Sequence, residues 1–371
     1  MRPASLRAQQ LLSLPLLALL SPALRLIPGS PAAAAGRAAW LSPLAALPIL
    51  LLYLGFLCLF CGRRGPEEGL AELCLRCLGQ RAGRIFLLFA GLWLLLFAGF
   101  SLRAGAERCL LTVFPHASPA VFVLPLALLA LWAALGKLRS VGRLARMLLA
   151  PLGVLLLVLL LAALPDLHAG NLLPVTLYEL PAALRGSPPV LEIAGILLLC
   201  PCFFLDRAES LSFRGAALSL AGALALLTLL SAAVLGNFGA ALTQKLRLPF
   251  FTLVRNLVFF RSLERVEALT VSLWVFPDLV LETLLLRAAA RCLRTAFGSS
   301  GTMPEEPRLS LRGGRWLLPL AALAAAGIAL TLAPDARSFA RWSDELIPAW
   351  NLVFLALFPP VALIGKLRKK I

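Results

Sequence analysis

Four acidic residues in and beside one apolar segment are the side chains best placed to do chemistry. Glu264 and Glu267 share a face at the start of a helix predicted over 266–286, where the helix dipole favours negative charge. Asp278 and Glu282 are four residues apart and share a face farther along that helix. A carboxylate in the bilayer core costs about 2.5 to 3.5 kcal/mol on insertion scales. Asp278 and Glu282 are therefore predicted to face protein or water, and the first pair to anchor the helix.

Four cysteines have a spacing close to that of a zinc ribbon, C-x2-C-x12-C-x2-C, at Cys58, Cys61, Cys74 and Cys77. The first pair ends an apolar run, and the second lies in a segment of helical character without turn-forming residues. We interpret these cysteines as small apolar packing residues. The sequence therefore predicts no metal site, no cofactor and no disulfide framework.

The composition is that of a membrane protein. Of 371 residues, 60% are hydrophobic and 14% charged, whereas ordinary soluble chains are about half apolar and a quarter charged. Repeated apolar runs of membrane length predict an all-α polytopic membrane protein. The net charge of +17 comes from Lys and Arg between these runs, which the positive-inside rule explains without nucleic-acid binding.

The apolar runs predict about ten transmembrane helices in one integral-membrane domain over 1–371. Helices 1–5 fall within about 11–164 and helices 6–10 within about 190–364. The segment 237–265, before helix 8, has apolar residues at helical spacing and is predicted to be an amphipathic outer segment. The basic loops place both termini in the cytoplasm. Residues 1–28 alone fit either a cleavable signal peptide or a retained first helix.

Several short segments resemble, in order along the chain, the endospore germination permeases. The string LERVEALTVSLW resembles the eighth helix of that family, and the entry to helix 2 and the segment before helix 6 resemble it too. The residues that carry this resemblance are Trp40, Pro174, Glu264, Glu267 and Trp274. The family comprises the GerAB-type B subunits of nutrient germinant receptors, within the amino acid–polyamine–organocation (APC) superfamily. The resemblance implies that the first helix is retained.

Two predicted helices contain proline-centred interruptions at matching places. Ser21-Pro22-Ala23 falls in helix 1 and Cys200-Pro201-Cys202 in helix 6, five spans later. Such a pair is typical of a 5+5 inverted-repeat, LeuT-like transporter with its site at the midplane, although two ordinary proline kinks would look the same. The candidate ligand-binding residues are Ser21, Pro22, Ala23, Cys200 and Pro201, with Phe97, Phe100 and Ser101 of helix 3 chosen by depth.

The break residues carry no charge, so the expected ligand is small and zwitterionic or neutral. The family usually has a glycine-rich break in helix 1, and Pro22 here lacks an N–H to donate. The candidate buried charges, which could also form a relay, are Arg25, Glu192, Asp278 and Glu282. Arg25 either binds an anion or pairs with one of these three carboxylates.

The resemblance implies a germinant-sensing subunit in the spore inner membrane. Such a subunit would bind a small nutrient such as an amino acid and signal to partner A and C subunits. The alternative is an amino-acid transporter coupled to protons or another ion, with the buried carboxylates as its relay. An enzyme is not expected, because the sequence offers no nucleophile–base pair and only two histidines.

Overall fold

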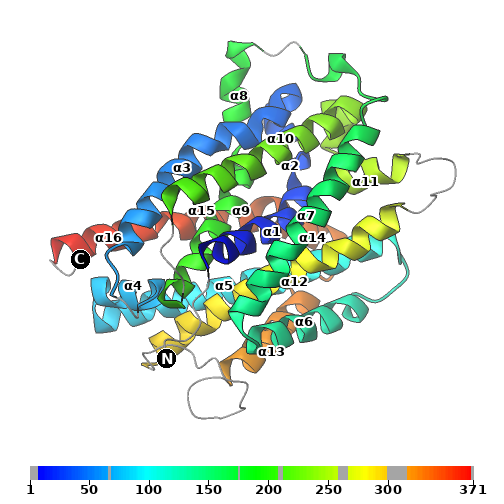
Figure 1. Ribbon diagram of the computed structural model, residues 1–371. Helices are drawn as coiled ribbons and strands as arrows, with labels where there is room; N and C mark the ends of the chain where they lie inside the picture. Colours follow the sequence, from blue (N-terminus) through cyan, green and yellow to red (C-terminus); the bar gives the residue numbers. More distant parts are fainter. Residues whose placement is uncertain are drawn as a thin grey trace.

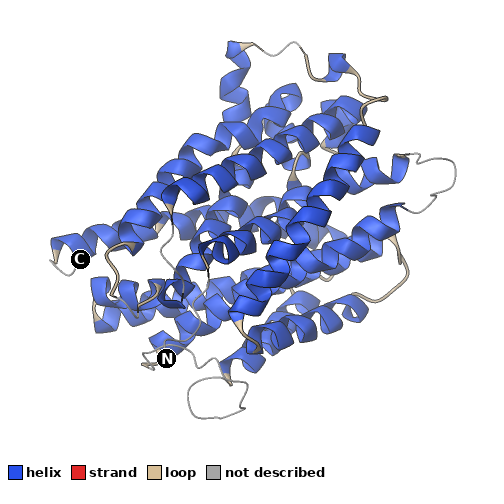
Figure 2. Cartoon of the chain, viewed as in Figure 1, coloured by secondary structure: helices blue, strands red, loops and turns tan. Residues whose placement is uncertain are grey.

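The computed structural model describes residues 7–65, 68–173, 176–207, 212–257, 266–298 and 316–368. Within these ranges every regular element is a helix (Figure 2). Two residues of the resemblance, Pro174 and Glu264, lie outside the described residues. Glu267 lies in the first turn of a helix, but its side chain is not among those described.

The helices follow one another with short links (Figure 1). The α-helices are α1 (Ala8–Leu26), α2 (Gly29–Ala35), α3 (Ser42–Cys61), α4 (Leu70–Leu78), α5 (Gln80–Thr112), α6 (Ala120–Leu135), α7 (Leu138–Ala162), α8 (Leu180–Arg185), α9 (Pro188–Leu199), α10 (Phe213–Thr243), α11 (Pro249–Asn256), α12 (Val266–Ala296), α13 (Leu317–Thr331), α14 (Ala336–Arg341), α15 (Ile347–Ala356) and α16 (Phe358–Leu367). The 3₁₀ helices are η1 (Gly36–Leu41), η2 (Ala169–Asn171), η3 (Leu177–Glu179) and η4 (Cys200–Arg207), and a π-helix, η5 (Trp342–Leu346), joins α14 to α15.

By length and composition, six helical segments in the described part of the chain can cross a membrane. They are Gly29–Cys61, Gln80–Thr112, Leu138–Ala162, Pro188–Asp206, Phe213–Thr243 and Ala336–Leu367. The helices α6 and α13 are apolar but shorter. The helix α12 has 31 residues, about 46 Å at 1.5 Å per residue, and carries several charges. The protein is therefore an all-helical membrane protein with several spans.

The predicted break in the first helix is wrong. The helix α1 continues through Pro22 to Leu26, and residues 21–23 are buried within it. A proline removes one N–H donor, and neighbouring elements can compensate for it in a membrane helix. Here the indole Nε1 of Trp274 on α12 donates to the Leu20 carbonyl at 3.3 Å. Packing around this turn keeps the helix whole.

The predicted break in the sixth helix is confirmed. The α-helical part, α9, ends at Leu199, and the chain continues as η4 from Cys200. Phe204 departs from helical geometry with φ −118° and ψ 15°. Pro201 contributes to this ending because it has no N–H for an α-helical hydrogen bond. One interruption of the predicted pair is therefore present in the structure.

The helices α5 and α12 form the centre of the bundle. They pack along each other, and α12 also contacts α1, α6 and α13 (Figure 1). Near the start of α12, the short helix α11 buries Phe250, Leu253 and Val254 and exposes Arg255. This arrangement places the charges of α12 against other helices.

Candidate functional site

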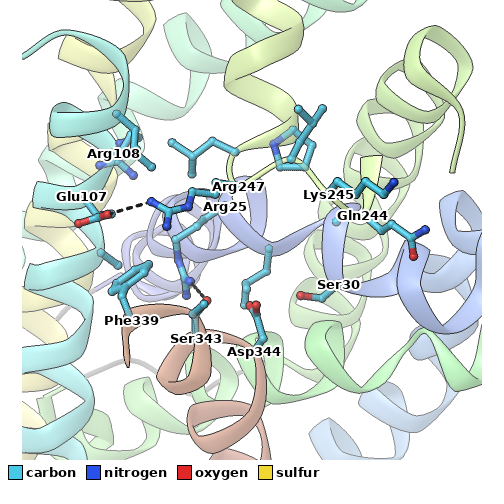
Figure 3. Close-up of a pocket in the computed structure, with 18 of the residues that line it drawn as sticks. Arg25, Ser30, Glu107, Arg108, Gln244, Lys245, Arg247, Phe339, Ser343 and Asp344 are labelled. Atoms are coloured by element: carbon cyan, nitrogen blue, oxygen red, sulfur yellow. Dashed lines mark hydrogen bonds and ion pairs between the residues drawn. The ribbon is translucent and has the colours of Figure 1, made fainter. Parts of the chain in front are cut away.

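A cavity of about 320 Å³ lies where the last turns of α1, α5 and α10 meet α11 and the α14–η5 segment (Figure 3). Helix α2 and the link between α10 and α11 complete its wall. Its size is at the lower end of the range for small-molecule sites. The charged and hydroxyl side chains that lie nearest one another there are Arg25, Glu107, Arg108, Arg247, Ser343 and Asp344.

Arg25, in the last turn of α1, is buried with 7% of its surface exposed. Its guanidinium donates a hydrogen bond to the Ser343 hydroxyl of the π-helix. The same group lies 5.2 Å from the ring centroid of Phe100, which stacks on Phe339 at 5.6 Å. Among the described residues no carboxylate oxygen lies within 4.0 Å of it. Arg25 is thus held by neutral partners.

A second buried arginine closes the inner end of the cavity. Arg108 of α5 forms an ion pair with Asp278 of α12, and their side chains are 2% and 4% exposed. Asp278 also accepts a hydrogen bond from the Ser21 hydroxyl of α1. Asp278 is close to α5 because that helix has glycine at position 105, where a Cβ would come within 3.3 Å of the carboxylate. The carboxylate therefore joins three helices.

Glu107 lies beside this pair on the cavity wall. Its carboxylate is 3.3 Å from Nη2 of Arg103, one turn back on α5, and 3.7 Å from Nη1 of Arg247 (Figure 3). Arg247 belongs to the link between α10 and α11 and is about half exposed. This contact holds the link against α5, and it already neutralises much of the charge on Arg247.

The other predicted buried carboxylates are buried and lie outside the cavity lining. Glu192 of α9 accepts a hydrogen bond from the Asn351 amide, whose oxygen in turn accepts one from the Trp93 indole at 3.1 Å. Glu282 of α12 is completely buried, and neither of its oxygens has a hydrogen-bond partner in the described structure. Arg25 forms an ion pair with neither of these carboxylates nor with Asp278.

The predicted ligand residues do not assemble around this cavity. Of the residues proposed from the sequence, the structure places Arg25 and no other on the cavity wall. The remainder are buried between helices: Ser21, Pro22, Ala23, Phe97, Phe100, Ser101, Cys200 and Pro201. Trp274 is buried beneath it against Phe250 and Phe251. Trp40 lies in η1, away from this site.

An ion cluster lies farther along α12. Arg291 is 2.8 Å from a Glu72 oxygen of α4 and 2.5 Å from an Asp206 oxygen of η4. Gly69 makes this approach possible, because a Cβ there would come within 2.8 Å of the Arg291 guanidinium and 2.5 Å of the Phe203 carbonyl. Thirteen residues separate Asp278 from Arg291, about 20 Å along the helix. The two charge clusters therefore lie toward opposite ends of the bundle.

The four cysteines with zinc-ribbon spacing are free thiols among packed side chains. Cys61, Cys74 and Cys77 are buried, and Cys58 is half-buried. In the described part of the chain, no group of three His, Cys, Asp or Glu side chains could hold a metal ion.

Comparison with known proteins identifies the family. The family model described as spore germination protein, the spore permease family, matches residues 5–302. A search of curated proteins gave no match. The matched region includes α1 to α12 and therefore the buried Arg108–Asp278 pair and most of the cavity wall. On this match, which covers most of its length, the chain belongs to the family of spore germination permeases.

Proposed function

We propose that this chain is the germinant-sensing subunit of a spore nutrient receptor. It would bind a small nutrient, such as an amino acid, in the cavity between α1, α5 and the α14–η5 segment. The family assignment supports a role in germination, and the cavity, closed below by the buried Arg25, is the observation that carries the ligand site. A sensor needs only a difference in ligand affinity between two conformations. Partner A and C subunits would receive the signal.

The proposed topology has ten spans with both termini in the cytoplasm. The spans would be α1, α3, α5, α6, α7, α9 with η4, α10, α12, α13 and the α14–α16 segment. In this orientation α1, α5 and α10 end at the outer face, so the cavity opens toward the outside of the spore inner membrane. A 5+5 inverted repeat remains our proposal for the arrangement of the helices, with the interruption kept in the sixth helix.

Thiol labelling tests this orientation. Gly170 is exposed, and a Cβ there would meet nothing within 4 Å, so Gly170→Cys adds a thiol without strain. We expect it to react with an impermeant reagent in intact cells, whereas Leu367→Cys, also exposed, reacts only after permeabilisation. Labelling is followed against the unaltered chain. The reverse pattern would contradict both the span count and the orientation.

Blocking the cavity tests the ligand site. Ala33 of α2 is exposed and lines the cavity, whereas its neighbour Ala34 is exposed and does not line it. We expect Ala33→Trp to abolish the germination response to nutrient because the indole fills the space, with normal amounts of protein in the membrane. Ala34→Trp is the matched control and should germinate like the parent. Equal responses from the two variants would place the ligand elsewhere.

The alternative function is ion- or proton-coupled amino-acid transport. One observation favours it: Glu282 is completely buried with neither oxygen hydrogen-bonded in the described structure, which is typical of a carboxylate that exchanges a proton or ion. Uptake of radiolabelled amino acid into vesicles that contain the purified subunit separates the two functions. Uptake driven by an ion gradient supports the transporter, and ligand binding without uptake supports the sensor.

A further inference from the structure

We infer that the cavity recognises a small carboxylate and that Arg25 is the residue that holds the carboxylate group. This inference rests on the proposed ligand cavity, but it does not depend on a role in germination. It also replaces the expectation of a neutral ligand drawn from the uncharged residues around Pro22.

The first support is the missing countercharge. Buried arginines elsewhere in the bundle have carboxylates close by: Arg108 pairs with Asp278, Arg103 with Glu107 and Arg291 with Glu72 and Asp206. Arg25 is buried to a similar degree, yet its hydrogen-bond partner in the described structure is the neutral Ser343 hydroxyl. Burying a charge without a partner is costly, and an incoming anion would remove that cost.

The second support is the charge of the cavity wall. It carries four cationic side chains and two acidic ones, which are Arg25, Arg108, Lys245, Arg247, Glu107 and Asp344. Arg108 is neutralised by Asp278 and Arg247 contacts Glu107, so Arg25 and Lys245 remain against Asp344. The surplus is one positive charge, and it suits a monoanion. A zwitterion would also fit, with its ammonium group toward Asp344.

The third support is the shape of the anchor. The guanidinium lies against the Phe100 ring and is bonded to Ser343, so its orientation is fixed before a ligand arrives. A planar guanidinium matches the two oxygens of a carboxylate, with two parallel N–H···O bonds, better than it matches chloride. Leu26, Ala104 and Phe339 supply apolar surface nearby for a short hydrocarbon body.

The direct test uses the purified full-length protein in lipid nanodiscs. The probes are acetate, L-lactate and L-alanine, with acetamide and L-lactamide as neutral matches and sodium chloride as a plain anion. A ligand that binds the folded state raises the unfolding midpoint. We expect at least one carboxylate to raise it, and the amides and chloride at equal concentration to leave it unchanged. Equal effects of carboxylate and amide, or no effect of any carboxylate, would overturn the inference.

Variants then assign the effect to Arg25. Arg25→Met should weaken the affinity for the binding carboxylate by about 10- to 100-fold, the loss expected for hydrogen bonds to a charged group. Arg25→Lys should fall between, because it keeps the charge but loses the fork. Arg247→Gln is the control, since Arg247 is exposed and already contacts Glu107. The ligand-free Arg25→Met protein should unfold at the parental temperature or above it, because a buried unpaired charge has been removed.

The outcomes separate this inference from the proposed function. A lower midpoint for ligand-free Arg25→Met, with unchanged carboxylate affinity, would make Arg25 a structural residue and end the inference. Carboxylate binding that depends on Arg25, in a protein whose deletion leaves germination unchanged, would keep the inference and remove the germination role. Loss of nutrient response on deletion, without carboxylate selectivity, would do the opposite.

Discussion

Replacing Asp278 by leucine is expected to lower the free energy of unfolding by about 3 to 5 kcal/mol. Arg108 would remain buried, with its charge and without its carboxylate, and this is the usual cost of breaking a buried ion pair from one side. The Ser21 hydroxyl would lose its acceptor as well. Thermal unfolding of the purified protein in detergent, followed by tryptophan fluorescence, measures the loss.

A double variant controls for the shape of the site. In Asp278→Leu with Arg108→Met both charges are gone, and we expect most of the stability to return, because a buried pair can be replaced by apolar side chains at little cost. Ser21→Ala alone should cost only about 1 kcal/mol, the net worth of one hydrogen bond. If the double variant were less stable than Asp278→Leu alone, the ion pair would not be what holds these helices.

Replacing Arg291 by methionine should cost a similar 3 to 5 kcal/mol, here concentrated at the end of the bundle where α4 is bound. Glu72 and Asp206 would then face each other across the space that the guanidinium occupied. Their repulsion should release α4, which these ion pairs hold to α12. Cys74 reports this release, since its thiol is completely buried on α4.

Alkylation of Cys74, followed by mass spectrometry in inside-out vesicles, measures the opening. Burial raises the pKa of the Cys74 thiol well above its ordinary value, so little of the reactive thiolate is present at neutral pH. We expect Arg291→Met to speed alkylation at least tenfold by removing that burial. Arg143→Met, at an exposed position on α7, should leave the rate unchanged. An unchanged rate in Arg291→Met would show that other contacts hold α4.

The class of protein and the course of its helices follow from the sequence, because long apolar runs need a membrane or a large core. The shared face of Asp278 and Glu282 follows as well, since helical spacing alone decides it. Their partners do not follow. Arg108 lies 170 residues before Asp278, and only the packing of α5 against α12 brings them together.

The two proline signals show where local rules stop. Pro201 coincides with the end of α9, but Pro22 lies inside a continuous α1. The difference lies in the surroundings, since Trp274 and Asp278 bond to the turn around Pro22 from another helix. The cavity was hidden for the same reason. Its wall takes one or two residues from each of several helix ends, and no spacing within the sequence unites them.

The family match ends at residue 302, but the wall of the cavity continues beyond it. Phe339, Ser343 and Asp344, which face Arg25 across the cavity, come from the α14–η5 segment. Belonging to the family therefore describes the scaffold and one side of the pocket, while the opposite side is left to vary. Two relatives with the same matched region could answer to different molecules after a few substitutions near the end of the chain. Diversification of what such proteins detect would require little change in what they are.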